Sequence, residues 1–214
     1  LQGDDGTALV MAVIFAAMLF TAGLSWKYIL PVAAMIPPAA IVAWNFLLDD
    51  DKKNRILAVI DPTLVEAADS WQQQRGLISI GNGGLWGNGV FMETGQFRYV
   101  PEVYNDFIFT YIGETVGFIG CLAVLLVLAF LCIRILSNGL RAPDDLGKYI
   151  CVGVFAMIGI QIIINIGMCL GMMPVIGVTL PFLSAGGTST GTLYLAIGVV
   201  LSVYVHSGKD RLFG

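Results

Sequence analysis

Long apolar runs constrain this chain more than any other feature. Five segments are long enough to cross a bilayer and carry almost no charge: residues 7–24, 28–48, 107–134, 149–172 and 188–206. A helix of about 20 apolar residues spans the hydrocarbon core. Only 12% of all residues are charged, against about a quarter in soluble domains. The sequence therefore predicts an all-α polytopic membrane protein with five transmembrane helices.

The distribution of basic residues predicts the orientation, because cytoplasmic connections are enriched in lysine and arginine. One side collects Lys27, Arg134, Arg141, Lys148, Lys209 and Arg211. The short connection 171–187 contains no lysine or arginine, so it is predicted to lie outside, together with a long extracytoplasmic loop at 49–105. Most acidic residues lie in that loop, and the sequence pI of about 4.8 argues against nucleic-acid binding.

The loop 49–105 is too long to be a simple connection and is predicted to be partly structured or functional. Its glycine-rich stretch at 80–89 matches neither a Walker A motif nor GxGxxG, so a nucleotide site is not indicated. We expect a tight-turn or re-entrant element there. Residues 55–62 are expected to form a short amphipathic helix that ends at Asp61 and Pro62.

The sequence contains few cysteine and histidine side chains that could form a catalytic or metal-binding site. The four cysteines all lie in apolar runs, where small buried side chains are expected rather than disulfides or metal ligands. His206 is the only histidine, so a histidine-based metal site or a Ser-His triad is excluded.

Asp106 lies where the polar loop enters the third apolar run. An ionisable residue at the mouth of a membrane helix is costly to place, so a functional role is one interpretation. A carboxylate that complements the helix macrodipole is the other. Position alone gives the two equal weight.

Glu114 lies inside the same run. Regular helical spacing would place Asp106, Thr110, Gly113 and Gly117 on one face, with Glu114 close by. Asp106 and Glu114 would be about 12 Å apart along a helix, which is too far for a proton-sharing dyad. Glu114 is either a second polar site or half of a buried pair, and the pair is slightly favoured.

The stretch 171–190 interrupts the apolar pattern with prolines, glycines and hydroxyl residues. Irregular backbone at membrane depth is tolerated only where protein buries it or where it lines a wet cavity. Five residues are therefore predicted beside a cavity on the Asp106 side: Ser184, Gly186, Gly187, Thr188 and Ser189. Backbone amides at Gly186 and Gly187 could receive a phosphate.

These stretches resemble the SEDS family (shape, elongation, division and sporulation), which includes RodA, FtsW and SpoVE. The residues that match its signature are Asn165, Gly171, Pro174, Gly177, Phe182, Leu183 and the run 184–189. Pro101-Glu102, 105–109 and Gly113-Glu114 resemble a second family block, and residues 1–8 resemble the opening of a span. The chain departs from the family at Gly3, Asp5, Tyr104-Asn105 and Thr115.

The resemblance implies a bundle of about ten spans, of which residues 1–214 would supply the last five as the C-terminal part of a single membrane domain. The forms at 173–177 and 184–186 are closer to RodA-type elongation proteins than to FtsW.

The resemblance also implies a function. The protein would be a peptidoglycan glycosyltransferase that polymerises lipid II at the outer face of the bacterial cytoplasmic membrane, for cell elongation or division. Asp106 would be the general base, and undecaprenyl diphosphate would leave. Glu102, Glu114 and residues 184 and 186–189 would bind substrate. Arg75 and Arg98, or a divalent cation such as Mg²⁺, would supply the positive charge that diphosphate departure needs. A class B penicillin-binding transpeptidase would be the partner.

Two other functions remain open. A flippase for lipid-linked precursors would place its essential charge at mid-membrane, on Glu114. A non-catalytic scaffold for a penicillin-binding protein would keep its function after Asp106→Ala.

Overall fold

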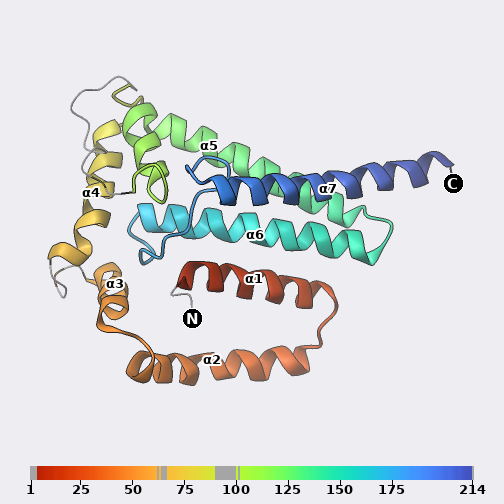
Figure 1. Cartoon of the computed structure of the whole chain (residues 1–214), viewed down its shortest axis with the longest axis horizontal. Coiled ribbons are helices and arrows are strands. Elements are labelled where there is room, and N and C mark those ends of the chain that lie inside the picture. The colour runs from red at the N-terminus through yellow and green to blue at the C-terminus, as the bar shows by residue number, and fades with distance from the viewer. Residues whose placement is uncertain (1–3, 62, 64–66, 90–99, 101, 214) are drawn as a thin grey trace.

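Figure 1 shows the computed structural model, in which the described residues form helices joined by turns and loops. Residues 4–61, 63, 67–89, 100 and 102–213 are described. Their helices are α1 (Asp5–Thr21), α2 (Trp26–Phe46), α3 (Asp50–Ile60), α4 (Ala67–Gly83), α5 (Ile108–Leu140), α6 (Asp145–Cys169) and α7 (Gly187–Phe213). The predicted all-helical class is confirmed.

Four of the five predicted spans are long and apolar enough to cross a membrane: α2, α5, α6 and α7. The remaining one, α1, is an apolar helix of 17 residues, at the lower end of the roughly 17–25 residues that spanning helices use. The structure extends α5 to Leu140, beyond the predicted end at residue 134. These helices make the chain a multi-pass membrane protein.

The helix α6 lies at the centre of the bundle and packs against α1, α5 and α7, while α4 packs across α5. In Figure 1, α3, α4 and the α6–α7 loop lie at one end of the bundle. The α1–α2 and α5–α6 turns lie at the opposite end, as the distribution of basic residues predicts. In contrast, α2 has no buried residue and stands apart from the other spans.

The described part of the polar loop contains two helices, and a glycine turn that hydrogen-bonds to α5. Gly117 interrupts α5 with φ 76° and ψ −169°, a conformation that favours glycine. The turn at 84–89 compensates the interruption, because the Asn88 amide donates to the Glu114 carbonyl and the Phe118 amide donates to the Gly84 carbonyl, both at 2.9 Å. The predicted tight turn is confirmed, and its partner is α5.

The prediction of one helical face from Asp106 to Gly117 is wrong. The helix begins at Ile108, after Asp106, and loses its regular geometry at Gly117. The prediction from periodicity assumed an unbroken helix. In the structure, the segment 84–89 forms hydrogen bonds with α5 from outside that helix. The short helix predicted at 55–62 is confirmed, although α3 begins earlier, at Asp50, and ends at Ile60.

Candidate functional site

Asp106 lies in a tight turn that leads into α5. Its backbone amide donates to the Glu102 carbonyl at 3.0 Å, and Glu102 adopts a left-handed φ of 53°. Phe107, the next residue, is completely buried in a cluster with Phe109, Cys169 and Leu180. The buried ring therefore fixes the turn, and Asp106 is held at the edge of the core with a half-buried side chain.

Asn165 joins the Asp106 turn to the broken stretch after α6. Its side-chain amide donates to the Asp106 carbonyl at 2.8 Å and to the Val178 carbonyl at 2.7 Å, and the residue is fully buried. A further bond runs from the Ala185 amide to the Tyr104 carbonyl at 2.8 Å. These hydrogen bonds join the turn that contains Asp106 to the stretch that contains Val178 and Ala185, which is distant in sequence.

The Asp106 carboxylate lies against Gly177 of the broken stretch. Gly177 has φ +70°, and a Cβ atom built there would lie 3.4 Å from Asp106 Oδ2. The same glycine lines two cavities. The family pattern predicted the glycine but not its position beside Asp106.

The surroundings make Asp106 a stronger base than an ordinary aspartate. Burial raises the pKa of Asp106, and the negative charge of Glu102 raises it further. Among the described residues, the carboxylate accepts no hydrogen bond from the first turn of α5, whose N-cap residue is Phe107 without a side-chain cap. Asp106 therefore does not cap α5 through a side-chain hydrogen bond.

The larger cavity beside Gly177 has a volume of about 620 Å³ and charged walls. Lys52 and Arg55 of α3 and Asp4 and Asp5 at the start of α1 line it, together with Pro174, Ile176 and Gly177. Residues i and i+3 lie on one face of a helix, so both basic side chains of α3 face this cavity. Lys52 and Arg55 were not among the predicted site residues, because the short helix expected at 55–62 leaves out Lys52, whereas α3 includes both.

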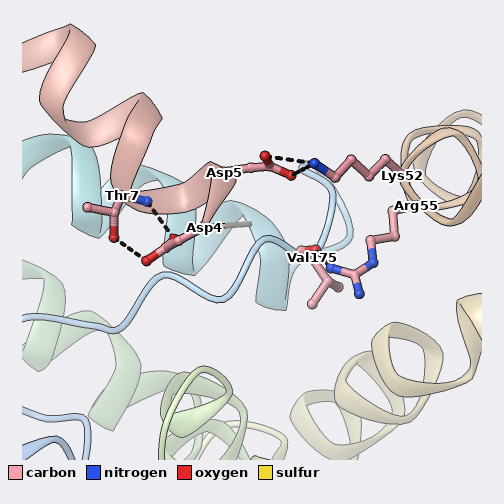
Figure 2. A network of polar contacts seen from close by, with 6 residues as sticks. All are labelled: Asp4, Asp5, Thr7, Lys52, Arg55 and Val175. Carbon is pink, nitrogen blue, oxygen red and sulfur yellow. Dashed lines mark hydrogen bonds and ion pairs between the residues drawn. The ribbon is translucent and has the colours of Figure 1, made fainter. Parts of the chain in front are cut away.

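Figure 2 shows the polar contacts that hold the walls of this cavity together. Lys52 Nζ forms an ion pair with Asp5 Oδ2 at 2.8 Å, and Arg55 Nη1 donates to the Val175 carbonyl at 3.1 Å. The helix α3 is thus tied both to α1 and to the stretch that contains Gly177.

Asp4 has a structural role at the same wall. Its carboxylate accepts hydrogen bonds from the Thr7 amide at 2.9 Å and the Thr7 hydroxyl at 2.6 Å, which caps α1 (Figure 2). The hydroxyl and then the amide of Thr7 lower the pKa of Asp4. The carboxylate of Asp4 is therefore held as an anion.

The second cavity, of about 400 Å³, lies between α1, α6 and α7, and Thr188 and Ser189 line it together with Gly177. Of the other predicted residues, Ser184 accepts a hydrogen bond from the Leu180 amide at 2.8 Å, and Gly186 accepts one from the Ser189 hydroxyl at 3.1 Å. Gly187 begins α7. The structure thus places Thr188 and Ser189 at a cavity and gives Ser184 a contact within its own loop.

Two predicted site residues lie away from the cavities beside Gly177, and a third is not among the described residues. Glu114 is buried between α4 and α5, where the Ser79 hydroxyl donates to its carboxylate; this is a buried pair, as the sequence slightly favoured. Arg75 lies over the Trp71 ring at 5.6 Å and lines neither cavity beside Gly177. Arg98 lies outside the described residues.

Within the part of the chain that the structure describes, no group of three or more His, Cys, Asp or Glu side chains could hold a metal ion. The four cysteines are buried and free, as predicted. The candidate site consists of the Asp106 carboxylate, a neighbouring glycine and a cavity whose walls carry two basic and two acidic side chains.

Comparison with known proteins places this site in a family. The family model FTSW_RODA_SPOVE, described as cell cycle protein, matches residues 1–209. The chain is 34% identical over 210 residues to the peptidoglycan glycosyltransferase MrdB of Escherichia coli K12, covering 96% of this chain and 56% of MrdB. It is 36% identical over 206 residues to the stage V sporulation protein E of Bacillus subtilis 168, with the same coverage.

A solved chain has the same fold. It belongs to a structure described as "Structural coordination of polymerization and crosslinking by a peptidoglycan synthase complex", and it matches with a TM-score of 0.79 and 27% identity over 96% of this chain and 57% of that one. The chain spans a little over half the length of these relatives. The resemblance noted in the sequence is confirmed: the chain belongs to the FtsW/RodA/SpoVE family of cell cycle proteins.

Proposed function

We propose that the protein is a peptidoglycan glycosyltransferase that polymerises lipid II, with undecaprenyl diphosphate as the leaving group. The observation that carries the proposal is the placement of Asp106. A carboxylate with a raised pKa lies at the end of a spanning helix, next to a cavity whose walls carry two basic side chains. Two relatives named above are a peptidoglycan glycosyltransferase and a sporulation protein.

In the proposed reaction, Asp106 acts as the general base. A sugar hydroxyl of the acceptor approaches the carboxylate and transfers its proton to it while its oxygen attacks the anomeric carbon of the donor. The raised pKa of Asp106 favours this transfer, because a base is more effective as its pKa approaches the working pH. The turn that contains Asp106 is fixed by Asn165, so the carboxylate is positioned before substrate binds.

We assign binding of the leaving diphosphate to Lys52 and Arg55 in place of Arg75. Both side chains line the cavity beside Gly177, the glycine that adjoins the Asp106 carboxylate, whereas Arg75 is directed at Trp71. Arginine and lysine bind phosphate oxygens well. A magnesium ion could add charge here, because Mg²⁺ commonly binds one or two carboxylates together with substrate phosphates, and Glu102 would be the carboxylate, which leaves Asp106 to act as the base.

The setting of the reaction is also part of the proposal. We place Asp106 and both cavities on the outer side of the bacterial cytoplasmic membrane, because the basic turns lie at the opposite end of the bundle. A class B penicillin-binding transpeptidase is the proposed partner. The structure that matches this fold is described as coordinating polymerisation with crosslinking, which supports a partner of that kind.

The test is polymerisation of lipid II by the purified full-length protein in detergent or liposomes, comparing the wild type with Asp106→Asn. A positioned general base contributes roughly 10²–10⁴-fold to rate, so the variant should form glycan strands at least about a hundredfold more slowly. Thermal unfolding of the variant should match that of the wild type.

Two variants extend the test. Arg55→Gln should weaken substrate use, whereas Arg75→Gln, its matched control on α4, should not. Normal polymerisation by Asp106→Asn would refute the base assignment. Lipid translocation that depends on Glu114, without polymerisation by the wild type, would favour the flippase instead.

A further inference from the structure

The stretch 173–178 carries Gly177 and has no regular secondary structure. Within the described part of the chain, its residues from 174 onward form no hydrogen bond between backbone groups. Side chains from other elements hold the stretch instead. Three of its carbonyls accept hydrogen bonds from such side chains: those of Met173, Val175 and Val178. The donors lie on α4, α3 and α6 in that order, and the one on α4 is Gln73.

Gln73 forms two hydrogen bonds at the end of α6. Its side-chain amide donates to the Met168 carbonyl at 3.0 Å and to the Met173 carbonyl at 2.9 Å, which uses both of its amide hydrogens. Gln73 is 6% exposed, and Met168 is completely buried. Met168 lies in the last turn of α6, where carbonyls lack a regular partner within the helix. Gln73 therefore joins α6 to the stretch 173–178 through contacts inside the chain, whatever covers its surface.

The same face of α4 touches the other side of the candidate site. Gly76 comes three residues after Gln73, and residues three apart lie on one face of a helix. A Cβ atom built at Gly76 would lie 3.4 Å from Cδ1 of Phe107, the residue that follows Asp106. One face of α4 thus contacts both the turn that contains Asp106 and the stretch 173–178, and it sets their relative position.

We propose that Gln73 is a positioning residue for the polymerisation proposed above. Its two hydrogen bonds hold the stretch 173–178 so that Gly177 stays against the Asp106 carboxylate. Pro174 carries the restraint onward, because its ring fixes φ. Without the two bonds the stretch moves, and water reaches the carboxylate. The structural part of this inference stands on the contacts alone, and its kinetic part rests on the proposed function.

The kinetic consequence follows from the hydration of Asp106. Burial is the main cause of its raised pKa, followed by the charge of Glu102. The other titratable groups around it are the Cys169 thiol, 3.8 Å from the Asp106 carbonyl oxygen, and the four charged side chains of the cavity beside Gly177. Replacing Gln73 with an uncharged residue changes none of these charges. Hydration should therefore lower the pKa of Asp106, so that the base is ionised at lower pH.

The first test needs no activity. Hydrogen–deuterium exchange of the full-length protein measures opening at the hydrogen-bonded amides of residues 170–173 and 176. Gln73→Met keeps the length of the side chain and removes both donors, so exchange there should become about tenfold faster. Gln74→Met is the matched control, because the Gln74 amide donates to Ser70 within α4, and it should leave exchange unchanged.

The second test measures polymerisation of lipid II by the same variants across a range of pH. A small misplacement of groups around a reacting centre lowers the rate by up to about a hundredfold. Gln73→Met should therefore lower kcat by about ten- to a hundredfold and move the acidic limb of the pH–rate profile to lower pH. A variant that is only less stable would contain less active protein and keep the limb in place.

Two further variants keep the proposal falsifiable. Gln73→Lys restores a donor that can bond to the last carbonyls of a helix, so it should return exchange and kcat close to their wild-type values. Gln73→Asn is one methylene shorter and cannot reach both carbonyls, so it should behave as Gln73→Met does and replaces that variant if it fails to fold.

Each outcome separates this inference from the proposed function. Unchanged exchange in Gln73→Met, an acidic limb that stays in place, or fast exchange in Gln73→Lys would overturn the role of Gln73. If the wild type does not polymerise lipid II while exchange still responds to Gln73→Met, the proposed function fails and the structural role of Gln73 is supported.

Discussion

The helices α2 and α6 are both long and apolar, yet they are placed very differently in the protein. In α6, 44% of the most apolar window is buried, whereas in α2 none of it is buried. The helix α6 lies between α1, α5 and α7, while α2 is joined to the bundle through its turns and α3. Hydropathy alone therefore identifies a membrane helix without showing whether protein or lipid surrounds it.

Polar side chains show the same contrast. Asn165 of α6 donates to two carbonyls from other segments, whereas Asn45 of α2 donates to Ile41 in its own helix at 2.8 Å. An asparagine that bonds across segments fixes tertiary structure, while one that bonds within its own helix does not. The packed end of the bundle should thus respond strongly to substitutions that α2 tolerates.

The largest expected effect is that of Asn165→Leu. It leaves the Val178 carbonyl without the Asn165 donor and the Asp106 carbonyl with only the weak donor of the Cys169 thiol, at 3.8 Å, and each unsatisfied buried group costs about 1–3 kcal/mol. The free energy of unfolding should fall by about 2–5 kcal/mol, with loss of polymerisation. Asn45→Leu, measured by the same unfolding assay, should change it by less than about 0.5 kcal/mol. Equal effects at the two positions would contradict the contrast between α6 and α2.

A similar contrast exists within α4. A Cβ atom at Gly83 would lie 1.9 Å from the Gly113 carbonyl oxygen, whereas one at Gly81 would meet nothing within 4 Å. Gly83→Ala must push α4 away from α5, and overpacking of this kind costs about 1–3 kcal/mol. Gly81→Ala should be neutral or stabilise by up to about 1 kcal/mol. Thermal unfolding of both variants measures the two changes in stability. If Gly83→Ala is also neutral, α4 does not pack on α5 as described.

The attachment of α3 to α1 should be weak by comparison. The Lys52 and Asp5 side chains are 38% and 54% exposed, and exposed ion pairs contribute about 0.2–1 kcal/mol. A double-mutant cycle with Lys52→Gln and Asp5→Asn should give a coupling energy in that range, decreasing as salt is added. A coupling energy that salt leaves unchanged would mean that the pair is shielded from water.

The smallest expected effect is a pH shift from Glu102→Gln. The negative charge of Glu102 raises the pKa of Asp106, so the neutral glutamine should lower that pKa. Because a general base must be ionised, the acidic limb of the pH–rate profile should move to lower pH. If the acidic limb of the profile moves to higher pH, or if it reports the ionisation of Glu102 instead, Asp106 is not the titrating base.

Sequence reasoning succeeded where a local pattern carries the information. Apolar length predicted the spans, and the paired motifs around Asp106 and at 165–189 predicted the family. It failed at Gly117, because the turn 84–89 overrides the helical pattern of α5. It named Arg75 and Arg98 for the diphosphate. That Lys52 and Arg55 line the cavity beside Gly177 could not be predicted, because the direction in which a loop helix presents its charges depends on how that helix packs.

The sequence by itself determined that this chain is a bundle of membrane helices from a recognisable family, because hydrophobicity and motif spacing are properties of local sequence. Only the tertiary structure decided that Asn165 holds the Asp106 turn, that Gly177 lies against its carboxylate, and that α2 buries no residue against the described part of the chain. These features depend on contacts between segments distant in the chain, and such contacts are set by the packing of whole helices.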